Sequence, residues 1–329
     1  MSALLLPAAL SAPATGRSPG GVASVSDLLR RQAKDALQIT GAASSAWNGK
    51  TRWLPRPGSE AEPPGVVGVA EWDGTIYYDR RYVLEPLAEL FERPSGTRSA
   101  IAGYRAKNAL AVVLHENCHL LAADPRDHAA TREAWNWSTV VLEEGVTEAY
   151  SSRHLNDYVD RLGLERRAPG IRELEAETTY PLFVPAVTTL ARGVGRLTDQ
   201  SGDEVLRRLV IEAGGKKYGR LGRLVLDGTG LGDRMPARER EANAERIAEA
   251  AQEVLGEVGE LGSFLTREAA ERLSRRLGRE ALRAVLVALE RLDAEYPVAG
   301  APGTMVRLPS LAAPALPAPR WARAAASRD

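Results

Sequence analysis

One predicted helix, over residues 99–123, is apolar on every side and carries a group of ionisable side chains near its end. The run Ala-Leu-Ala-Val-Val-Leu precedes that group, and Leu-Leu-Ala-Ala follows it. A helix without a polar face belongs in the interior of a protein. The ionisable group is His115-Glu-Asn-Cys-His119, and burying such side chains without partners costs several kcal/mol. The sequence therefore predicts a fold that surrounds this helix and provides partners for two histidines and a carboxylate.

The spacing of these side chains indicates a metal site. Residues four apart lie on one face of a helix, so the imidazoles of His115 and His119 can reach the same cation. The pattern H-E-x-x-H is typical of zinc proteases, and Glu116 stands where it can accept a proton from a water on the metal. Zinc lowers the pKa of such a water to about 7, which makes a nucleophile available at neutral pH. The alternative is two core histidines that hydrogen-bond to neighbouring acceptors, with Cys118 as a small buried apolar residue.

A catalytic Zn²⁺ site normally takes three protein ligands, so another donor is expected downstream. The predicted helix 137–161 contains Glu143, Glu144 and Glu148. Glu144 and Glu148 are four residues apart, so they lie on one face of this helix, and the apolar stripe of the helix lies on another face. This arrangement predicts that Glu144 binds the metal and that Glu148 accepts a hydrogen bond from a ligand imidazole. Glu143 stays open as the third ligand, because it lies only one position away.

Two other histidines are alternative ligands. His128 lies nine residues beyond His119, but Asp124-Pro125 is expected to end the helix between them, which favours a solvated loop histidine. His154 lies ten residues past Glu144, on a helical face that is near but not the same. We interpret His154 as a surface or core residue.

The motifs on the two helices resemble those of a known group of enzymes. His115-Glu-x-x-His119 followed by Glu143-Glu-Gly-Val-Thr-Glu148 is similar to the gluzincin group of zinc metallopeptidases. That group includes thermolysin-like enzymes and the aminopeptidases with an Asn-Glu-Gly-Phe-Ala motif. The resemblance covers roughly residues 66–150. The separation of 25 positions between His119 and Glu144 is longer than in either family.

The resemblance implies a zincin-like catalytic domain and a role for each motif residue. The zinc ligands would be His115, His119 and Glu144. Glu116 would be the general base, and Glu148 would be the carboxylate that supports a ligand histidine.

Gluzincins also bring a Tyr or His from further downstream to stabilise the oxyanion of the tetrahedral intermediate. Tyr150, Tyr158 and Tyr180 are available, and the spacing does not choose among them. Tyr180 precedes Pro181 at the start of an apolar segment, and we take it as the catalytic candidate. For each tyrosine the alternative is a position in the core.

The apolar patterns predict an α+β fold that is predominantly helical. Two β-rich runs, residues 66–72 and 75–78, flank Asp73-Gly74, which predicts a hairpin ahead of the active-site helix. In zincins an edge strand binds the peptide substrate, and residues 75–78 are the candidate for that strand. The predicted helices begin with one near Ser26-Asp27 and continue over residues 83–93, 99–123, 137–161, 172–196, 202–213, 237–258 and 266–294, the last broken near Gly278.

Composition changes along the chain divide it into four regions. These are a flexible N-terminal arm over residues 1–22, the zincin-like metallopeptidase domain over 23–232, a helical C-terminal region over 233–297, and a flexible Pro/Ala-rich tail over 298–329. Five glycines between residues 216 and 233 mark the boundary between the two middle regions.

Composition also limits the classes of partner and compartment. Lys plus Arg number 43 and Asp plus Glu number 43, so bulk charge gives no argument for a nucleic-acid or membrane-surface partner. The single cysteine, Cys118, excludes an intrachain disulfide and a Cys-rich zinc module, and favours a reducing compartment. No apolar run approaches the roughly 20 residues of a membrane helix. We therefore expect a soluble, cytoplasmic protein, with secretion as the alternative because the first residues include a short apolar run.

The sequence thus predicts zinc-dependent hydrolysis of peptide bonds, with a peptide or protein as substrate and no prediction of the oligomeric state. One alternative is a regulatory or binding protein that keeps a zincin fold without catalysis, and another is a hydrolase of a non-peptide amide. Trp135 and Trp137 either support an aromatic side chain of the substrate or pack at the start of a helix. The basic stretch of residues 207–223 either binds an anionic partner or is a solvated face.

Overall fold

The computed structural model describes residues 21–54, 66–92, 99–122, 124–259 and 266–297. Residues 1–20 of the predicted arm and the whole predicted tail lie outside the described residues. The longer helices are α1 Val25–Thr40, α2 Glu85–Glu92, α3 Ala100–His119, α4 Pro125–Ala130, α5 Trp137–Arg153, α6 Leu155–Leu162, α7 Phe183–Leu197, α8 Gly202–Val210, α9 Lys217–Gly228, α10 Ala237–Gly259 and α11 Arg267–Glu295. Shorter helical turns are η1 Arg80–Leu84, η2 Thr131–Ala134, η3 Leu164–Arg166, η4 Ile171–Glu173, η5 Gly214–Lys216 and η6 Leu231–Arg234.

Five short strands accompany the helices, so the predicted α+β, predominantly helical class is confirmed at that level. The strands are β1 Ser44–Ser45, β2 Thr51–Trp53, β3 Gly68–Ala70, β4 Ile76–Tyr78 and β5 Leu121–Ala122. β3 and β4 form the predicted antiparallel hairpin, with Val69 opposite Tyr77. β2, which the sequence analysis did not predict, pairs parallel to β4, so the strand order is β2-β4-β3.

This order corrects the prediction of which strand is the edge. β4 is paired on both sides, so residues 75–78 have no free edge for a peptide. Among the described strands, the one whose edge lies free next to α3 is β3. The hairpin turn alone could not reveal this, because the deciding neighbour, β2, comes from a distant part of the sequence.

Helix α3 packs against α1, α2 and α5, and much of its length is buried, as its apolar circumference predicts. Its first turn is capped by the hydroxyl of Ser99, which accepts a hydrogen bond from the backbone of Ala102. The helix ends at His119, earlier than predicted, because Leu121–Ala122 forms strand β5 opposite β1. A short apolar run such as residues 120–123 is compatible with a buried strand as well as with a helix.

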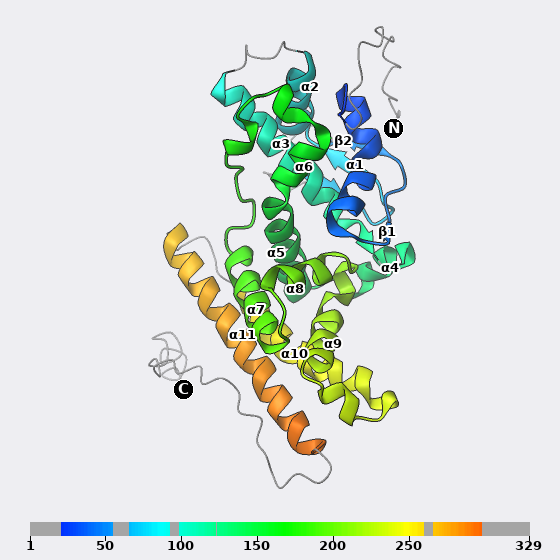
Figure 1. Cartoon of the computed structure of the whole chain (residues 1–329), viewed down its shortest axis with the longest axis vertical. Coiled ribbons are helices and arrows are strands. Elements are labelled where there is room, and N and C mark those ends of the chain that lie inside the picture. Colours follow the sequence, from blue (N-terminus) through cyan, green and yellow to red (C-terminus); the bar gives the residue numbers. More distant parts are fainter. Residues whose placement is uncertain (1–20, 55–65, 93–98, 123, 260–265, 298–329) are drawn as a thin grey trace, which may run out of the picture.

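Helix α5 lies between two groups of elements (Figure 1). It packs against α3 on one side and against α7, α8 and α10 on the other. The predicted helix 137–161 is interrupted at His154, where α5 ends and α6 begins. After the interruption, α6 packs against α1 and α3.

Helix α7 begins at Phe183 rather than near residue 172. The η4 turn covers Ile171–Glu173, and residues 174–182 then run outside a regular helix. This irregular stretch brings the ring of Tyr180 against that of His115 on α3. Among the described residues, no helix is both long and apolar enough to cross a membrane.

Gly222 and Gly278 lie where helices of the C-terminal half pack closely against others. The segment predicted to separate the last two regions contains α9, and α11 runs through Gly278 without a break. A Cβ added to Gly222 would lie 2.0 Å from the carbonyl oxygen of Ala244, and one on Gly278 would lie 2.3 Å from that of Ala186. Only glycine permits these approaches of α9 to α10 and of α11 to α7, which explains glycines at these two helical positions.

Candidate metal centre

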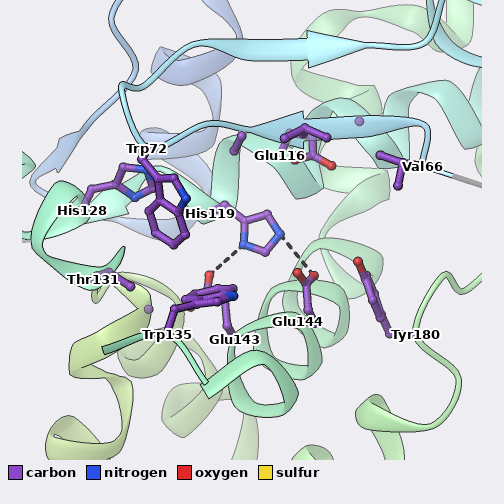
Figure 2. A pocket seen from close by; sticks show the side chains of 14 residues that line it. Val66, Trp72, Glu116, His119, His128, Thr131, Trp135, Glu143, Glu144 and Tyr180 are labelled. Atoms are coloured by element: carbon purple, nitrogen blue, oxygen red, sulfur yellow. Dashed lines mark hydrogen bonds and ion pairs between the residues drawn. The ribbon is translucent and has the colours of Figure 1, made fainter. Parts of the chain in front are cut away.

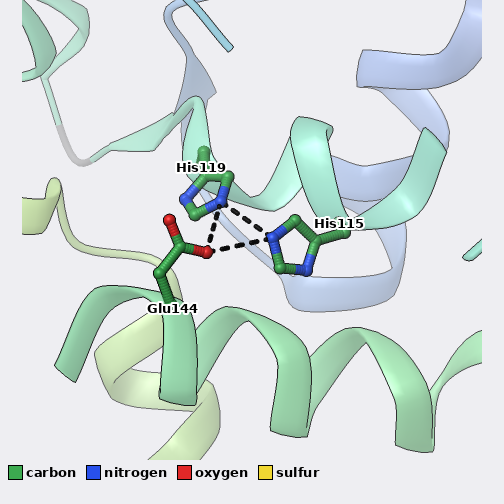
Figure 3. Close-up of side chains that lie close together, drawn as sticks. All are labelled: His115, His119 and Glu144. Carbon is green, nitrogen blue, oxygen red and sulfur yellow. Dashed lines mark hydrogen bonds and ion pairs between the residues drawn. The ribbon is translucent and has the colours of Figure 1, made fainter. Parts of the chain in front are cut away.

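The last turn of α3 faces the middle of α5 and brings together the three residues that the sequence analysis predicted as ligands (Figure 3). His115 Nε2 lies 2.9 Å from His119 Nε2. Glu144 Oε2, from α5, lies 3.2 Å from each of these nitrogens. The three donor atoms are close enough to hold one metal ion.

The second nitrogen of each imidazole is held by another carboxylate of α5. His115 Nδ1 donates to Glu148 Oε2 over 2.9 Å, and His119 Nδ1 donates to Glu143 Oε1 over 2.8 Å. When both Nδ1 atoms carry the proton, the neutral imidazoles present lone pairs at Nε2. Two lone pairs and a carboxylate oxygen that meet at one point repel one another, and a cation between them removes that repulsion. Such carboxylate partners are usual for histidines that bind metals.

The donor set fits zinc. Zinc binds histidine nitrogens and carboxylate oxygens tetrahedrally at about 2.0–2.2 Å, which places neighbouring donors roughly 3.4 Å apart. The separations of 2.9 Å and 3.2 Å between the donors are close to that spacing. Three protein donors leave one coordination position, as in catalytic zinc sites.

The charges around the cluster also favour a bound cation. Burial disfavours the charged form of His115, but hydrogen bonds with Glu144 and Glu148 outweigh it and raise its pKa to about 9. Burial likewise acts against the charge of His119, yet the neighbouring carboxylates raise its pKa well above the usual range. Burial acts against the carboxylate of Glu144, but the two imidazoles lower its pKa. Without a metal, protons on the imidazoles balance the carboxylates, and metal binding releases them.

Glu143, the alternative ligand, contacts His119 on the Nδ1 side and is therefore outside the donor triangle. Its other oxygen, Oε2, lies 3.0 Å from Nζ of Lys217, the first residue of α9. Both side chains are buried. The interpretation of residues 207–223 as a solvated basic face is therefore wrong for Lys217. No local pattern signals this ion pair, because it joins helices that are distant in sequence.

Glu116 lies between α3 and the edge strand β3. A Cβ added to Gly68 would lie 2.6 Å from Glu116 Oε1, so the strand approaches this closely only with glycine there. Burial raises the pKa of Glu116, and the imidazoles of His115 and His119 and the backbone N–H of Ala70 offset part of this rise. A carboxylate with a raised pKa is better matched to accept a proton near neutral pH.

Tyr180 lies beside Glu144, on the side of it away from Trp72 and Trp135 (Figure 2). Its ring stacks on that of His115, with centroids 5.7 Å apart and planes 14° apart. Burial and the negative charge of Glu144 raise the pKa of the Tyr180 phenol, which therefore stays protonated as a donor. The neighbouring backbone N–H of Thr179 donates to Glu148 Oε1 over 3.0 Å, which ties this stretch to the site.

The other two tyrosine candidates lie away from the triad. Tyr150 donates from its hydroxyl to the carbonyl oxygen of Ile39 over 3.1 Å. Tyr158 is fully buried in the hydrophobic core. The structure thus brings only Tyr180, of these three, to the metal cluster.

The two other histidines also lie outside the triad. His128 is buried rather than solvated, because its Nε2 lies 3.2 Å from the carbonyl oxygen of Glu71 and its ring packs against Trp72. The interpretation as a solvated loop residue is therefore wrong. His154 begins α6, where its Nδ1 lies 2.7 Å from Asp157 Oδ2 near the surface.

Two cavities open beside the cluster. One, of about 220 Å³, borders His119 and Glu144, and the other, of about 430 Å³, borders His115. Both are also lined by Glu116 and Tyr180. Space for a bound molecule is therefore present on both sides of the proposed base.

Comparison with known proteins adds no relative. No protein-family model, curated protein sequence or solved structure matches the chain. The resemblance to gluzincins therefore depends on the motif residues alone.

Proposed function

We propose that this protein is a zinc-dependent hydrolase of peptide bonds, with a zincin-like arrangement from β3 to α5. The observation that carries this proposal is the meeting of His115 Nε2, His119 Nε2 and Glu144 Oε2 at one point. Two core histidines that served only packing would not need a carboxylate on each Nδ1 and both Nε2 atoms aimed at a third carboxylate.

Zn²⁺ is the proposed cofactor, with these three residues as its ligands. When bound, the ion acts as a Lewis acid toward water and toward a carbonyl oxygen. Glu148 and Glu143 would hold the two imidazoles in the tautomer that binds metal.

Glu116 would accept a proton from the attacking water and later donate it to the leaving amine. Its burial between α3 and β3, with a raised pKa, supports this role. Tyr180 would donate from its hydroxyl to the oxygen of the reacting carbonyl, because it remains protonated and lies beside Glu144.

A peptide in extended form would lie along the free edge of β3. Val67 and Glu71 use their backbone groups to pair with β4, through Asp79 and Thr75. In an antiparallel pair the alternate residues point their backbone groups to the opposite side, so those of Gly68 and the carbonyl of Ala70 face the free edge, while the N–H of Ala70 contacts Glu116. Backbone pairing of this kind gives affinity for peptides of diverse sequence.

The test is cleavage of a diverse peptide library by zinc-loaded protein, with new N-termini identified by mass spectrometry. We expect cleavage that Glu116→Gln abolishes while zinc content and fold are kept, because the amide cannot accept the water's proton. Full zinc occupancy without any cleavage that depends on Glu116 would instead favour a binding protein or a hydrolase of non-peptide amides.

A further inference from the structure

The smaller cavity has an aromatic wall beside His119. Figure 2 shows Trp72, His128 and Trp135 grouped on one side of that histidine, with Tyr180 on the far side of Glu144. These three aromatic residues come from the hairpin turn, α4 and the residue after η2, which are separate elements.

The rings of the aromatic wall hold one another in place. The Trp72 and Trp135 rings meet edge to face, with centroids 5.0 Å apart and planes at 80°. The ring of His128 lies 5.6 Å from that of Trp72, and its Nε2 is fixed on the carbonyl oxygen of Glu71. Trp135 is still 37% exposed, so part of this wall is open to a ligand. Such a surface offers edge-to-face and stacked contacts to another aromatic ring.

No free charge faces the cavity from this wall. Burial lowers the pKa of His128, so its ring is neutral at pH 7. Glu143, which also borders the cavity, is already paired with His119 and Lys217. An acidic side chain placed there would lose its hydration without gaining a positively charged partner, and the wall offers a basic side chain no carboxylate that is not already paired.

The cavity is small and lies next to the reacting groups. Its volume of about 220 Å³ is below the roughly 300–1,000 Å³ of sites that enclose a whole small molecule, so it suits a single side chain. Glu116 and Glu144 border it directly. A side chain in the cavity would therefore belong to a residue adjacent to the scissile bond.

We propose that the cavity formed by Trp72, His128 and Trp135 selects a bulky aromatic side chain next to the bond that is cleaved. This inference rests on the proposed peptidase function. It makes Trp135 and Trp72 specificity-determining residues, and it assigns phenylalanine-like or tryptophan-like residues as the preferred substrate class.

The kinetic test compares peptides that differ at one position on either side of the cleaved bond. At one of these positions, Phe or Trp should exceed Ala and Lys by at least about 10-fold in kcat/KM. Trp135→Ala should remove most of that preference while leaving zinc content unchanged. The matched control is Trp137→Ala, because Trp137 is 69% exposed and does not line the cavity. Equal kcat/KM values for Phe, Ala and Lys at both positions would overturn the inference.

A binding test separates this inference from the proposed activity. Zinc-loaded Glu116→Gln protein is titrated with N-acetyl-phenylalanine amide, and with the alanine and lysine analogues, by ligand-observed NMR. We expect the aromatic amide to bind at least about 10-fold more tightly, and Trp135→Ala, with an unchanged circular dichroism spectrum, to remove the difference. Aromatic binding without peptide cleavage would refute the peptidase and keep the cavity's selectivity. Equal binding of the three amides, or tighter binding of the lysine amide, would refute the selectivity.

Discussion

Nζ of Lys217 lies 3.0 Å from Oε2 of Glu143, and the two side chains are 1% and 2% exposed. The other oxygen of Glu143 accepts the hydrogen bond from His119 Nδ1. Helix α9 therefore provides the positive charge that keeps this carboxylate ionised and in position behind His119, a proposed metal ligand. Glu143 is buried with a lowered pKa, because the charges of Lys217 and His119 outweigh the effect of burial.

Replacing this lysine should weaken metal binding from a distance. Lys217→Met removes the cation that pairs with this buried carboxylate, which should lower the free energy of unfolding by about 3–5 kcal/mol. Zinc affinity should fall by about 10-fold to 100-fold, as for other residues that support a ligand. Urea unfolding and competition with a chromophoric chelator measure the two effects. Lys216→Met is the matched control, because Lys216 is 50% exposed, and equal zinc affinity in the two variants would contradict the role of Lys217.

The protein should bind about one zinc ion per chain, because one cluster of three donors converges within the described part of the chain. His115→Ala and His119→Ala should lose this metal in elemental analysis. His154→Ala should keep it, because His154 pairs with Asp157 away from the cluster. Removing zinc with a chelator should also lower the midpoint of thermal unfolding, since the folded state alone binds the ion. Unchanged metal content in both triad variants would rule out this site.

The three glutamates of α5 should separate into one ligand and two supports. Glu144→Ala should lose zinc, whereas Glu148→Ala should reduce zinc affinity by about 10-fold to 100-fold because it frees His115 Nδ1. Glu143→Gln should have an effect of similar size through His119. Isothermal titration of each variant with zinc measures the differences. Loss of zinc from Glu143→Gln, together with full retention in Glu144→Ala, would show that Glu143 is the ligand and Glu144 the supporting residue.

Gly68→Val should reduce hydrolysis without removing the metal. Its Cβ would lie 2.6 Å from Glu116 Oε1 and 2.8 Å from a methyl carbon of Val112, so the base or the strand must move. A displacement of about 1 Å can cost roughly 100-fold in rate, and we expect a loss of that size in kcat/KM at unchanged zinc content. Gly219→Ala, on the partly exposed face of α9, is the control that should retain activity. Full activity in Gly68→Val would show that this contact does not position Glu116.

The thiol of Cys118 should be unreactive in the folded protein. Burial raises its pKa to about 12, and the residue is 0% exposed. The thiolate is the reactive form, so at pH 8 the native protein offers almost none of it. Modification by a disulfide reagent should therefore require unfolding and should complete in urea. Rapid stoichiometric labelling of the native protein would contradict this burial.

Local sequence patterns predicted the features that depend on a single helix or a single turn. The apolar circumference of residues 99–119 required burial, and helical spacing placed His115 and His119 on one face. The Asp73-Gly74 pair specified the hairpin. The same patterns wrongly predicted a helix break at Gly278. In the sequence, a glycine that ends a helix cannot be told from one that lets another backbone approach.

By itself, then, the sequence determined which side chains one helix presents together, and that two imidazoles and a row of carboxylates would need partners. Only the tertiary structure decided that Glu144 faces both Nε2 atoms while Glu143 turns to Lys217, that β3 is the free edge, and that Tyr180 reaches His115. The physical reason is that periodicity belongs to a single helix or strand, whereas these relationships depend on how separate elements pack.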